Sequence, residues 1–353
     1  MRKLHFWSTL AASLVTFTAT CQAATLPVTS DLLIQLDGTD VTLDSGGVQN
    51  WNNQVPAAGV PASFDAVLAT NRPTLLPSQP MPNGSFHNTV SFIKGGTGTS
   101  NPGLTNPDYL VAGASSGFDS LRTLTMFSVF KVNSVAPAGN SAATATAAGQ
   151  KEQVIFASRH TTTAPSSTIA WSHTFEDDVN GDTAGSPPAI TPQFRQTGNL
   201  SQNITDAELA PASVAANTWY VVASRWNGTI NPVNGQPAWT STSVVVTPGA
   251  LPNTIETATV SATATAEGVW STHEAFAIGK NTAATGGSST RGFLDGQIAE
   301  ILVYGDTLTE ADFNAVTGYL ARKYLIPEPS SICLAAAMAL LGITYLRRRT
   351  GKA

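Results

Sequence analysis

The chain has 353 residues, of which only 12% are charged, and it is rich in Gly, Pro, Ser, Thr, Ala and Asn. This composition favours short strands joined by turns and argues against a helical bundle. Between positions 24 and 326, 12 basic and 22 acidic residues give a formal net charge of -10. Because phosphate recognition needs clustered Lys and Arg, this charge argues against nucleic acid as a partner.

The first 23 residues have the order of a secretory signal peptide. Arg2 and Lys3 precede a mostly apolar stretch, residues 4–19, which is followed by small residues around Ala23. This order predicts a signal peptide over residues 1–23, with the exported domain beginning at residue 25. The alternative is a lipoprotein modified at Cys21, although position 18 holds Thr where such sites usually have Leu.

Both cysteines, Cys21 and Cys333, belong to the terminal segments. The predicted exported domain, residues 25–326, therefore has no disulfide. We expect a packed core to stabilise it.

Runs rich in β-branched and aromatic residues, separated by turn residues, predict an all-β sandwich or jelly roll. In the last of these strands the alternation places Ile298, Leu302 and Tyr304 on one side. Ile301 and Val303 then lie on the other, as in a strand buried on both faces. The predicted strands are 31–37, 90–94, 124–132, 153–158, 219–226, 243–247, 275–279 and 297–304.

One helix is predicted after the last strand. The sequence from Thr309 to Asp312 begins like a capping box, and apolar residues follow at helical spacing up to Tyr324. Two stretches rich in Ala and Thr, 136–149 and 257–266, are predicted to be exposed loops or edge hairpins.

Several segments, taken in their order along the chain, resemble those of a known domain family. They are LIQLD (33–37), VQNWNNQ (48–54), RPT (72–74), VSF (90–92), FSVFK (127–131), NTWYVV (217–222), FLDGQIAEILVY (293–304) and YLARKY (319–324). This order resembles the laminin-G-like, concanavalin-A-like domains of exported bacterial proteins. The resemblance implies that residues 25–326 form two large antiparallel sheets packed face to face.

The tryptophans of this domain have a structural interpretation beside a functional one. Trp51, Trp219 and Trp226 could serve as sugar-binding platforms, but large aromatic residues in strands are more often core anchors. We predict that all three are core.

A catalytic site is not predicted. Glycoside hydrolysis needs two carboxylates across the scissile bond, and laminarinase-like relatives of this fold carry them on a Glu-x-Asp-x-x-Glu strand. The nearest stretch here, residues 176–181, ends in Gly181. A divergent polysaccharide hydrolase or lyase using scattered acids such as Asp177 and Glu300 stays open as an alternative.

The histidines do not suggest a metal centre. His87, His160, His173 and His273 lack the spacing of paired metal ligands, so we interpret each as a surface or loop histidine.

Asp178, Asn180 and Asp182 are a candidate calcium site, because their oxygen-bearing side chains occupy alternate positions. Ala189 stands where the final Glu of an EF-hand loop would be. A polar hairpin loop without metal is therefore the favoured interpretation.

The C-terminal segment has three parts. Pro327, Glu328 and Pro329 precede an apolar run, and the run is followed by Arg347, Arg348 and Arg349. The 17 residues 330–346 are just long enough for a transmembrane helix, whose basic end would stay in the cytoplasm. A simple single-pass anchor is one interpretation.

The order and chain position of these parts also resemble the PEP-CTERM sorting signal, here residues 327–353. The resemblance implies cleavage by an exosortase in the inner membrane of a Gram-negative bacterium. The protein would then pass to the cell surface or extracellular matrix.

Together these features predict an exported, exosortase-sorted surface or matrix protein. Its partners would be the secretion machinery, the exosortase and, transiently, the inner membrane. The domain is expected to bind extracellular polysaccharide or another surface component, without catalysis. A purely structural envelope or biofilm protein is the other alternative.

Overall fold

A computed structural model describes most of the predicted domain. The described residues are 25–55, 57–93, 96–97, 104–105, 107–113, 116–118, 121, 123–133, 152–160, 168–176, 189–194, 215–230, 237–248, 256–263, 273–280 and 293–327. Contacts divide the chain into two units, and the secondary structure described below belongs to Pro27–Ile326. The predicted signal peptide, calcium loop and transmembrane segment 330–346 lie outside the described residues.

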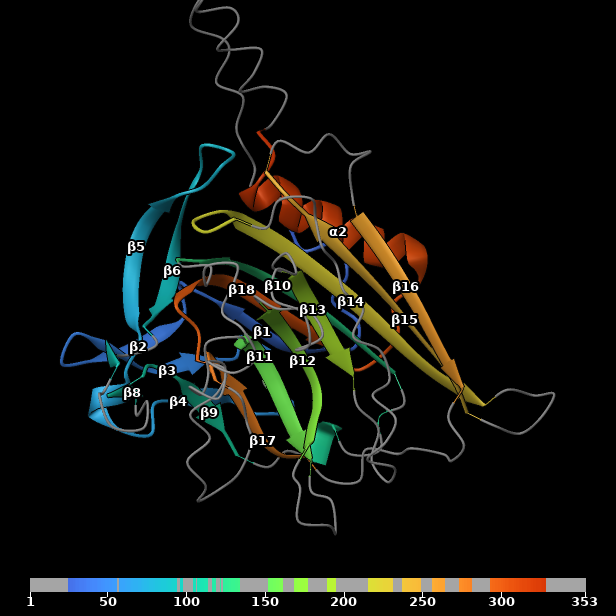
Figure 1. The fold of residues 1–353 in the computed structure, drawn as a ribbon, viewed down its shortest axis with the longest axis horizontal. Helices are drawn as coiled ribbons and strands as arrows, with labels where there is room; N and C mark the ends of the chain where they lie inside the picture. The colour runs from blue at the N-terminus through green and yellow to red at the C-terminus, as the bar shows by residue number, and fades with distance from the viewer. Residues whose placement is uncertain are drawn as a thin grey trace, which may run out of the picture. The chain divides into compact units, whose positions relative to one another are not determined.

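Two large antiparallel sheets make up the domain, which confirms an all-β sandwich (Figure 1). Sheet A has the order β16 (Glu256–Thr263), β15 (Pro237–Val246), β14 (Trp219–Ile230), β10 (Thr123–Val132), β18 (Gly296–Tyr304), β6 (Phe86–Phe92) and β5 (Thr74–Pro80). Beside β6, β1 (Leu32–Asp37) also pairs with β18.

Sheet B has eight strands. Its order is β13 (Ala189–Phe194), β12 (Thr168–Glu176), β11 (Glu152–His160), β17 (His273–Ile278), β9 (Leu110–Ala112), β4 (Ser63–Asp65), β3 (Gly47–Asn52) and β2 (Val41–Asp44). A separate small ladder joins β7 (Gly96–Thr97) to β8 (Leu104–Thr105), and two short 3-10 helices are η1 (Ala69–Asn71) and η2 (Ser116–Phe118).

The main core fills the space between the sheets. Strands of both sheets contribute apolar side chains to it. Its large aromatic members include Trp51, Phe64, Phe92, Phe118, Phe130, Trp171, Tyr220 and Trp226.

The tryptophans predicted to be core are buried. Trp51 and Trp226 belong to the core between the sheets, while Trp219 is buried on the opposite face of β14. The Trp51 indole Nε1 donates a 2.8 Å hydrogen bond to the backbone oxygen of Asp37. The structural interpretation of these three residues is confirmed.

Helix α2 (Glu310–Tyr324) covers the outer face of sheet A (Figure 1). Phe313 packs against Phe127 of β10, with ring centroids 5.6 Å apart, and Phe127 in turn contacts Tyr304 of β18. Strands β10 and β18 are therefore buried on both faces, and nearly every residue of each is buried.

The start of α2 is the predicted one. The Thr309 hydroxyl accepts a hydrogen bond from the Asp312 amide at 3.2 Å and donates one to the Asp312 carboxylate at 2.7 Å. Both acidic residues of the first turn, Glu310 and Asp312, also favour this end of the helix dipole.

A bulge in β18 shows that the side predicted for Ile298 was wrong. Val129 of β10 pairs with Glu300, but the next residue, Phe130, pairs with Ile298, so Ala299 is an extra residue. Ile298 therefore joins Ile301 and Val303 in the core between the sheets, not Leu302 on the helix side. Strict alternation fails wherever such a residue is inserted.

The Ala- and Thr-rich segment near position 260 forms β16, the edge strand paired with β15. Of the two structures predicted for this stretch, an exposed loop or an edge hairpin, the edge hairpin is the one observed. The other such stretch, 136–149, lies outside the described residues. Within the described ranges, no helix is long and apolar enough to cross a membrane.

Candidate functional site

A pocket of about 330 Å³ opens at one part of sheet B, where β4 meets β9. Its walls are the turn before β4, the residues after β9 and the first residue of η2, with Ser63 and Asp65 of β4 in the lining. The lining combines Ser63, Asp65 and Ser116 with the apolar residues Val60 and Pro61. Its size is at the lower end of the range for ligand sites and suits one small ligand unit.

Two glycines allow the two walls to meet. The amide of Gly117 donates a 2.7 Å hydrogen bond to the Gly59 carbonyl oxygen. A Cβ on Gly117 would lie 2.7 Å from that oxygen, and Gly59 itself has a φ of +77°. A larger residue at either position would separate the walls.

Asn53 holds the turn that forms one wall. It is buried, and its Nδ2 donates to the carbonyl oxygens of Leu33 at 2.9 Å and Pro61 at 3.0 Å. Its Oδ1 accepts from the amides of Gln35 at 2.9 Å and Val55 at 3.2 Å. The side chain uses its full bonding capacity, so β1 and the pocket wall are joined through the core.

The carboxylate of Asp65 is the charged group of the pocket. Its Oδ1 accepts hydrogen bonds from Asn50 Nδ2 at 2.6 Å and from Ser63 Oγ at 2.7 Å. Asn50 faces Asp65 across the β3–β4 pair, so the ladder register fixes this contact. Among the described residues Oδ2 has no hydrogen-bond partner, which leaves one oxygen to accept from a ligand.

Polar side chains continue from the pocket across β3 to β2. Asn52 donates to Asp40 at 3.1 Å and to Thr42 at 3.4 Å. Since Asn50 and Asn52 sit two residues apart on one strand, they lie on the same face. The pocket is thus one end of a polar strip on sheet B.

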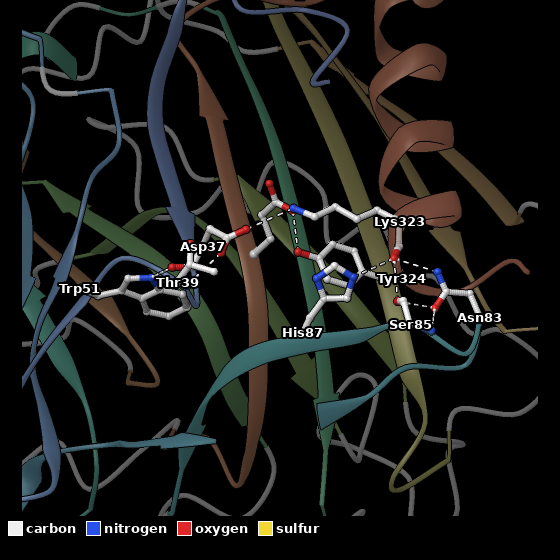
Figure 2. Close-up of polar contacts among 9 residues, drawn as sticks. Asp37, Thr39, Trp51, Asn83, Ser85, His87, Lys323 and Tyr324 are labelled. Carbon is white, nitrogen blue, oxygen red and sulfur yellow. Dashed lines mark hydrogen bonds and ion pairs between the residues drawn. The ribbon is translucent and has the colours of Figure 1, made fainter. Parts of the chain in front are cut away.

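A second polar cluster lies where the end of α2 contacts sheet A (Figure 2). Glu300, on β18 and 1% exposed, accepts hydrogen bonds at Oε2 from Lys323 Nζ and Tyr324 Oη, both at 2.8 Å. Lys323 Nζ also contacts Asp37 Oδ2 at 3.2 Å. Asp37 pairs with Glu300 in the β1–β18 ladder, which brings both acids to one ammonium.

The charges of this cluster depend on one another. Burial raises the pKa of Glu300 above its usual value, and Lys323 opposes that rise. Burial alone would raise the pKa of Asp37, but Lys323 brings it below its usual value. Burial would lower the pKa of Lys323, but the two carboxylates raise it well above its usual range.

The β5–β6 hairpin completes the cluster by binding the last carbonyl groups of α2 (Figure 2). Asn83 Nδ2 donates to the backbone oxygens of Arg322 and Lys323, both at 2.8 Å. The ring of His87 contacts that of Tyr324 at 4.6 Å, and its Nε2 lies 3.2 Å from the Lys323 oxygen. These bonds satisfy carbonyls that a helix end leaves unpaired.

This arrangement joins elements and does not resemble a cleft for substrate. Glu300, one of the two acids considered for a divergent enzyme, lies beneath α2, so a substrate could reach it only if α2 moved. The other, Asp177, lies outside the described residues. The pocket at Asp65 is in another sheet and has no part in this cluster.

His173 corrects the interpretation of the histidines as surface or loop residues. It lies on β12 and is 1% exposed. Its Nδ1 is 2.8 Å from Ser128 Oγ of β10, and its Nε2 contacts Ser224 Oγ of β14. The side chain therefore links the two sheets through the core, and burial lowers its pKa to about 3.

The structure describes only some of the other residues considered in the sequence analysis. His87 is half-buried at the α2 cluster, and the ladder pairs His160 of β11 with His273 of β17 after a register shift. The calcium candidates Asp178, Asn180 and Asp182 lie outside the described residues. Within the described ranges no group of three or more His, Cys, Asp or Glu could hold a metal ion.

Sequence reasoning missed Asp65 and the pocket. The available signals were the Gly-Val-Pro-Ala turn at 59–62 and the Ser-x-Asp alternation that follows it. Neither signal says that Asn50 would lie opposite Asp65, because that contact depends on strand pairing.

No protein-family model and no curated protein matches this chain. Among solved structures, a Trypanosoma rangeli sialidase in complex with 2,3-difluoro-KDN is similar with a TM-score of 0.42 and 9% identity, covering 86% of this chain and 34% of that one. An α-L-arabinofuranosidase of glycoside hydrolase family 54 has a TM-score of 0.43 and 12% identity over 85% of this chain and 60% of that one.

The binding domain of botulinum neurotoxin serotype D/C is also similar, with a TM-score of 0.40 and 10% identity over 82% of this chain and 52% of that one. This chain thus spans between about a third and three-fifths of the length of these proteins. At these values the similarity carries no argument about what this chain binds.

Proposed function

We propose that this chain is an exported surface or extracellular-matrix protein whose sandwich binds neutral polysaccharide at the pocket beside Asp65. In this proposal the domain is a LamG-like jelly roll preceded by a signal peptide. The tail, residues 327–353, is a PEP-CTERM signal that an exosortase cuts at the inner membrane. The protein acts by binding, not by catalysis.

The arrangement around Asp65 carries the binding part of the proposal. Sugars present hydroxyl groups around apolar CH groups, and a small pocket with mixed lining suits both. Asp65 is held by Asn50 and Ser63 and keeps one oxygen able to accept from a sugar hydroxyl. The net charge of -10 between positions 24 and 326 favours an uncharged polymer over an acidic one, because like charges repel.

The tail sequence supports the sorting part of the proposal. A short apolar span with a basic end follows Pro327, Glu328 and Pro329 directly, and this order favours processing over a plain anchor. A divergent hydrolase is less well supported, because Glu300 is paired with Lys323 beneath α2.

The glycan-binding test compares two variants on an array of neutral polysaccharides. We expect Asp65→Ala to weaken binding about tenfold or more, since a hydrogen bond to a charged group contributes roughly 1.5–3 kcal/mol. None of the residues in the described pocket lining is aromatic. Ring stacking is then missing, so the protein should be displayed at high density to detect weak binding.

Asp44→Ala is the matched control, because Asp44 is a 47% exposed carboxylate on β2 of the same sheet and is not in the pocket lining. It should bind like the wild type. If Asp65→Ala binds equally well, or if the wild type retains no glycan, the polysaccharide proposal is wrong.

A further inference from the structure

The tip of the β5–β6 hairpin, residues 81–86, lies beside the C-terminal end of α2 (Figure 1). Besides the two hydrogen bonds from the side-chain Nδ2 of Asn83, its backbone N–H donates to the Tyr324 carbonyl oxygen at 3.4 Å. Ser85 Oγ lies 3.3 Å from the Lys323 oxygen. The hairpin tip and the end of the helix are therefore fixed to each other.

Only a short stretch of chain connects the end of α2 to the apolar run. The amides of Leu325 and Ile326 both donate to the Ala321 oxygen, at 2.7 and 2.8 Å, so the fold holds the chain up to Ile326. Three residues lie between Ile326 and Ser330, where the predicted membrane segment starts. Fully extended, the four Cα–Cα steps from Ile326 to Ser330 span at most about 14 Å. A membrane entered by residues 330–346 must therefore lie close to the end of α2.

The surface of the β5–β6 hairpin is suited to contact with a membrane. No charged residue occurs between positions 73 and 93, although the domain carries a net charge of -10. Phe86 is 68% exposed, more than any other large apolar residue among the described ones. An exposed aromatic ring on an uncharged surface is favourable at the lipid interface and unfavourable in water. Acidic residues there would be repelled by anionic lipids.

We propose that the hairpin tip, with Phe86, rests on the lipid surface that the tail enters while the chain is still full length. This contact rests on the membrane stage of the proposed function. It fixes the orientation of the sandwich, with the end of α2 and the hairpin tip turned toward the bilayer.

Spin labelling can test this contact, because the only cysteines are Cys21, in the predicted signal peptide, and Cys333. In a Cys333→Ser background lacking the signal peptide, Pro82→Cys places a nitroxide on the tip and leaves Phe86 intact. Leu43→Cys is the control, since Leu43 is a 49% exposed apolar residue on β2 of the other sheet. The otherwise full-length chain is reconstituted in phosphatidylethanolamine–phosphatidylglycerol vesicles.

We expect the label at position 82 to be relaxed more by lipid-soluble oxygen than by a water-soluble nickel complex. The label at position 43 should show the reverse order. Adding Phe86→Ser to the Pro82→Cys protein should shift its label toward the nickel-accessible behaviour. Circular dichroism checks that each protein remains folded.

Three results would overturn the proposal in different ways. If the protein floats with vesicles but position 82 is as nickel-accessible as position 43, only the hairpin contact fails. If the protein does not float with vesicles, the membrane stage of the proposed function fails with it. If position 82 is shielded only at high protein-to-lipid ratio, with spin–spin broadening, the tip contacts a second copy of the chain.

Discussion

At the scale of single residues, His173 shows how the core uses a polar side chain. It is buried, but its two ring nitrogens contact hydroxyls from β10 and β14, so neither is left without a partner. A buried imidazolium would lack water, and burial therefore lowers the pKa of His173 to about 3. The folded protein keeps this residue neutral where the unfolded chain would bind a proton.

This difference predicts a pH dependence of stability. In the unfolded chain His173 has a pKa near 6.5, so the stability from its neutral form is complete above that pH and is lost as the pH falls toward 3. The loss is at most about 1.4 kcal/mol per pH unit. Burial raises the pKa of Asp108 to about 6, but this carboxyl is the same in both proteins, so between pH 6.5 and 5 His173→Gln should reduce the slope of the free energy of unfolding against pH.

Urea unfolding at several pH values measures this slope. His173→Gln is expected to lower stability at pH 7 as well, because its shape differs, so the slope and not the absolute value is compared. Equal slopes for the two proteins would show that His173 does not keep its low pKa.

At the scale of elements, the docking of α2 depends on one lysine placed between two acids. Lys323 reaches Glu300 of β18 and Asp37 of β1, and Tyr324 donates to the same Glu300 oxygen. The second oxygen of Glu300 is buried without a hydrogen-bond partner among the described residues. The pairing with Lys323 is thus what makes a carboxylate acceptable at this depth.

Lys323→Met should therefore destabilise the domain by about 2–4 kcal/mol, since it leaves the Glu300 carboxylate buried and unpaired. Adding Glu300→Gln to this variant should recover part of the loss, because the uncompensated charge is removed. Arg322→Met is the control: Arg322 is exposed in the same turn of α2, and its loss should change stability little.

Urea unfolding of the wild type, Lys323→Met, Glu300→Gln and the double variant measures the coupling between positions 300 and 323. If the double variant is as unstable as the sum of the two single losses, then Lys323 acts through packing and not through the charge of Glu300.

At the scale of the whole molecule, the tail follows the sandwich domain directly in the sequence. The last backbone bond of the described fold is made by Ile326, and Pro327 follows it. A proline there cannot extend the α2 hydrogen bonds. The proposed sorting motif thus begins two residues after Leu325, the C-cap of α2.

Replacing Pro327, Glu328 and Pro329 by Ala distinguishes a sorting signal from an anchor. If the tail only anchors the protein, the apolar span and its arginines suffice and the change should matter little. We expect instead that, in a host with an exosortase, the wild type loses its tail and leaves the inner membrane. The triple variant should remain full length and membrane-bound.

Intact mass and membrane fractionation measure both outcomes. Equal processing and localisation of the two proteins would leave a single-pass anchored protein in place of a sorted one.

The sequence by itself determined the class of the fold and its best-patterned elements. Strands such as β10 and β18 were predictable because they are rich in β-branched, aromatic and other apolar residues, and α2 because Thr309 and Asp312 mark its start. These signals are local, so they survive without knowledge of the neighbours. Short or polar strands such as β4 and β12 carry weak local signals and were not predicted.

Only the tertiary structure decided which residues meet. Asp65 and Asn50 face each other through β3–β4 pairing, and the Lys323 cluster joins residues 286 positions apart. The bulge at Ala299 likewise became visible only in the ladder with β10. Such contacts arise from strand register and from the packing of α2 on sheet A. Both are fixed by burying the whole core at once, so no single segment contains the information.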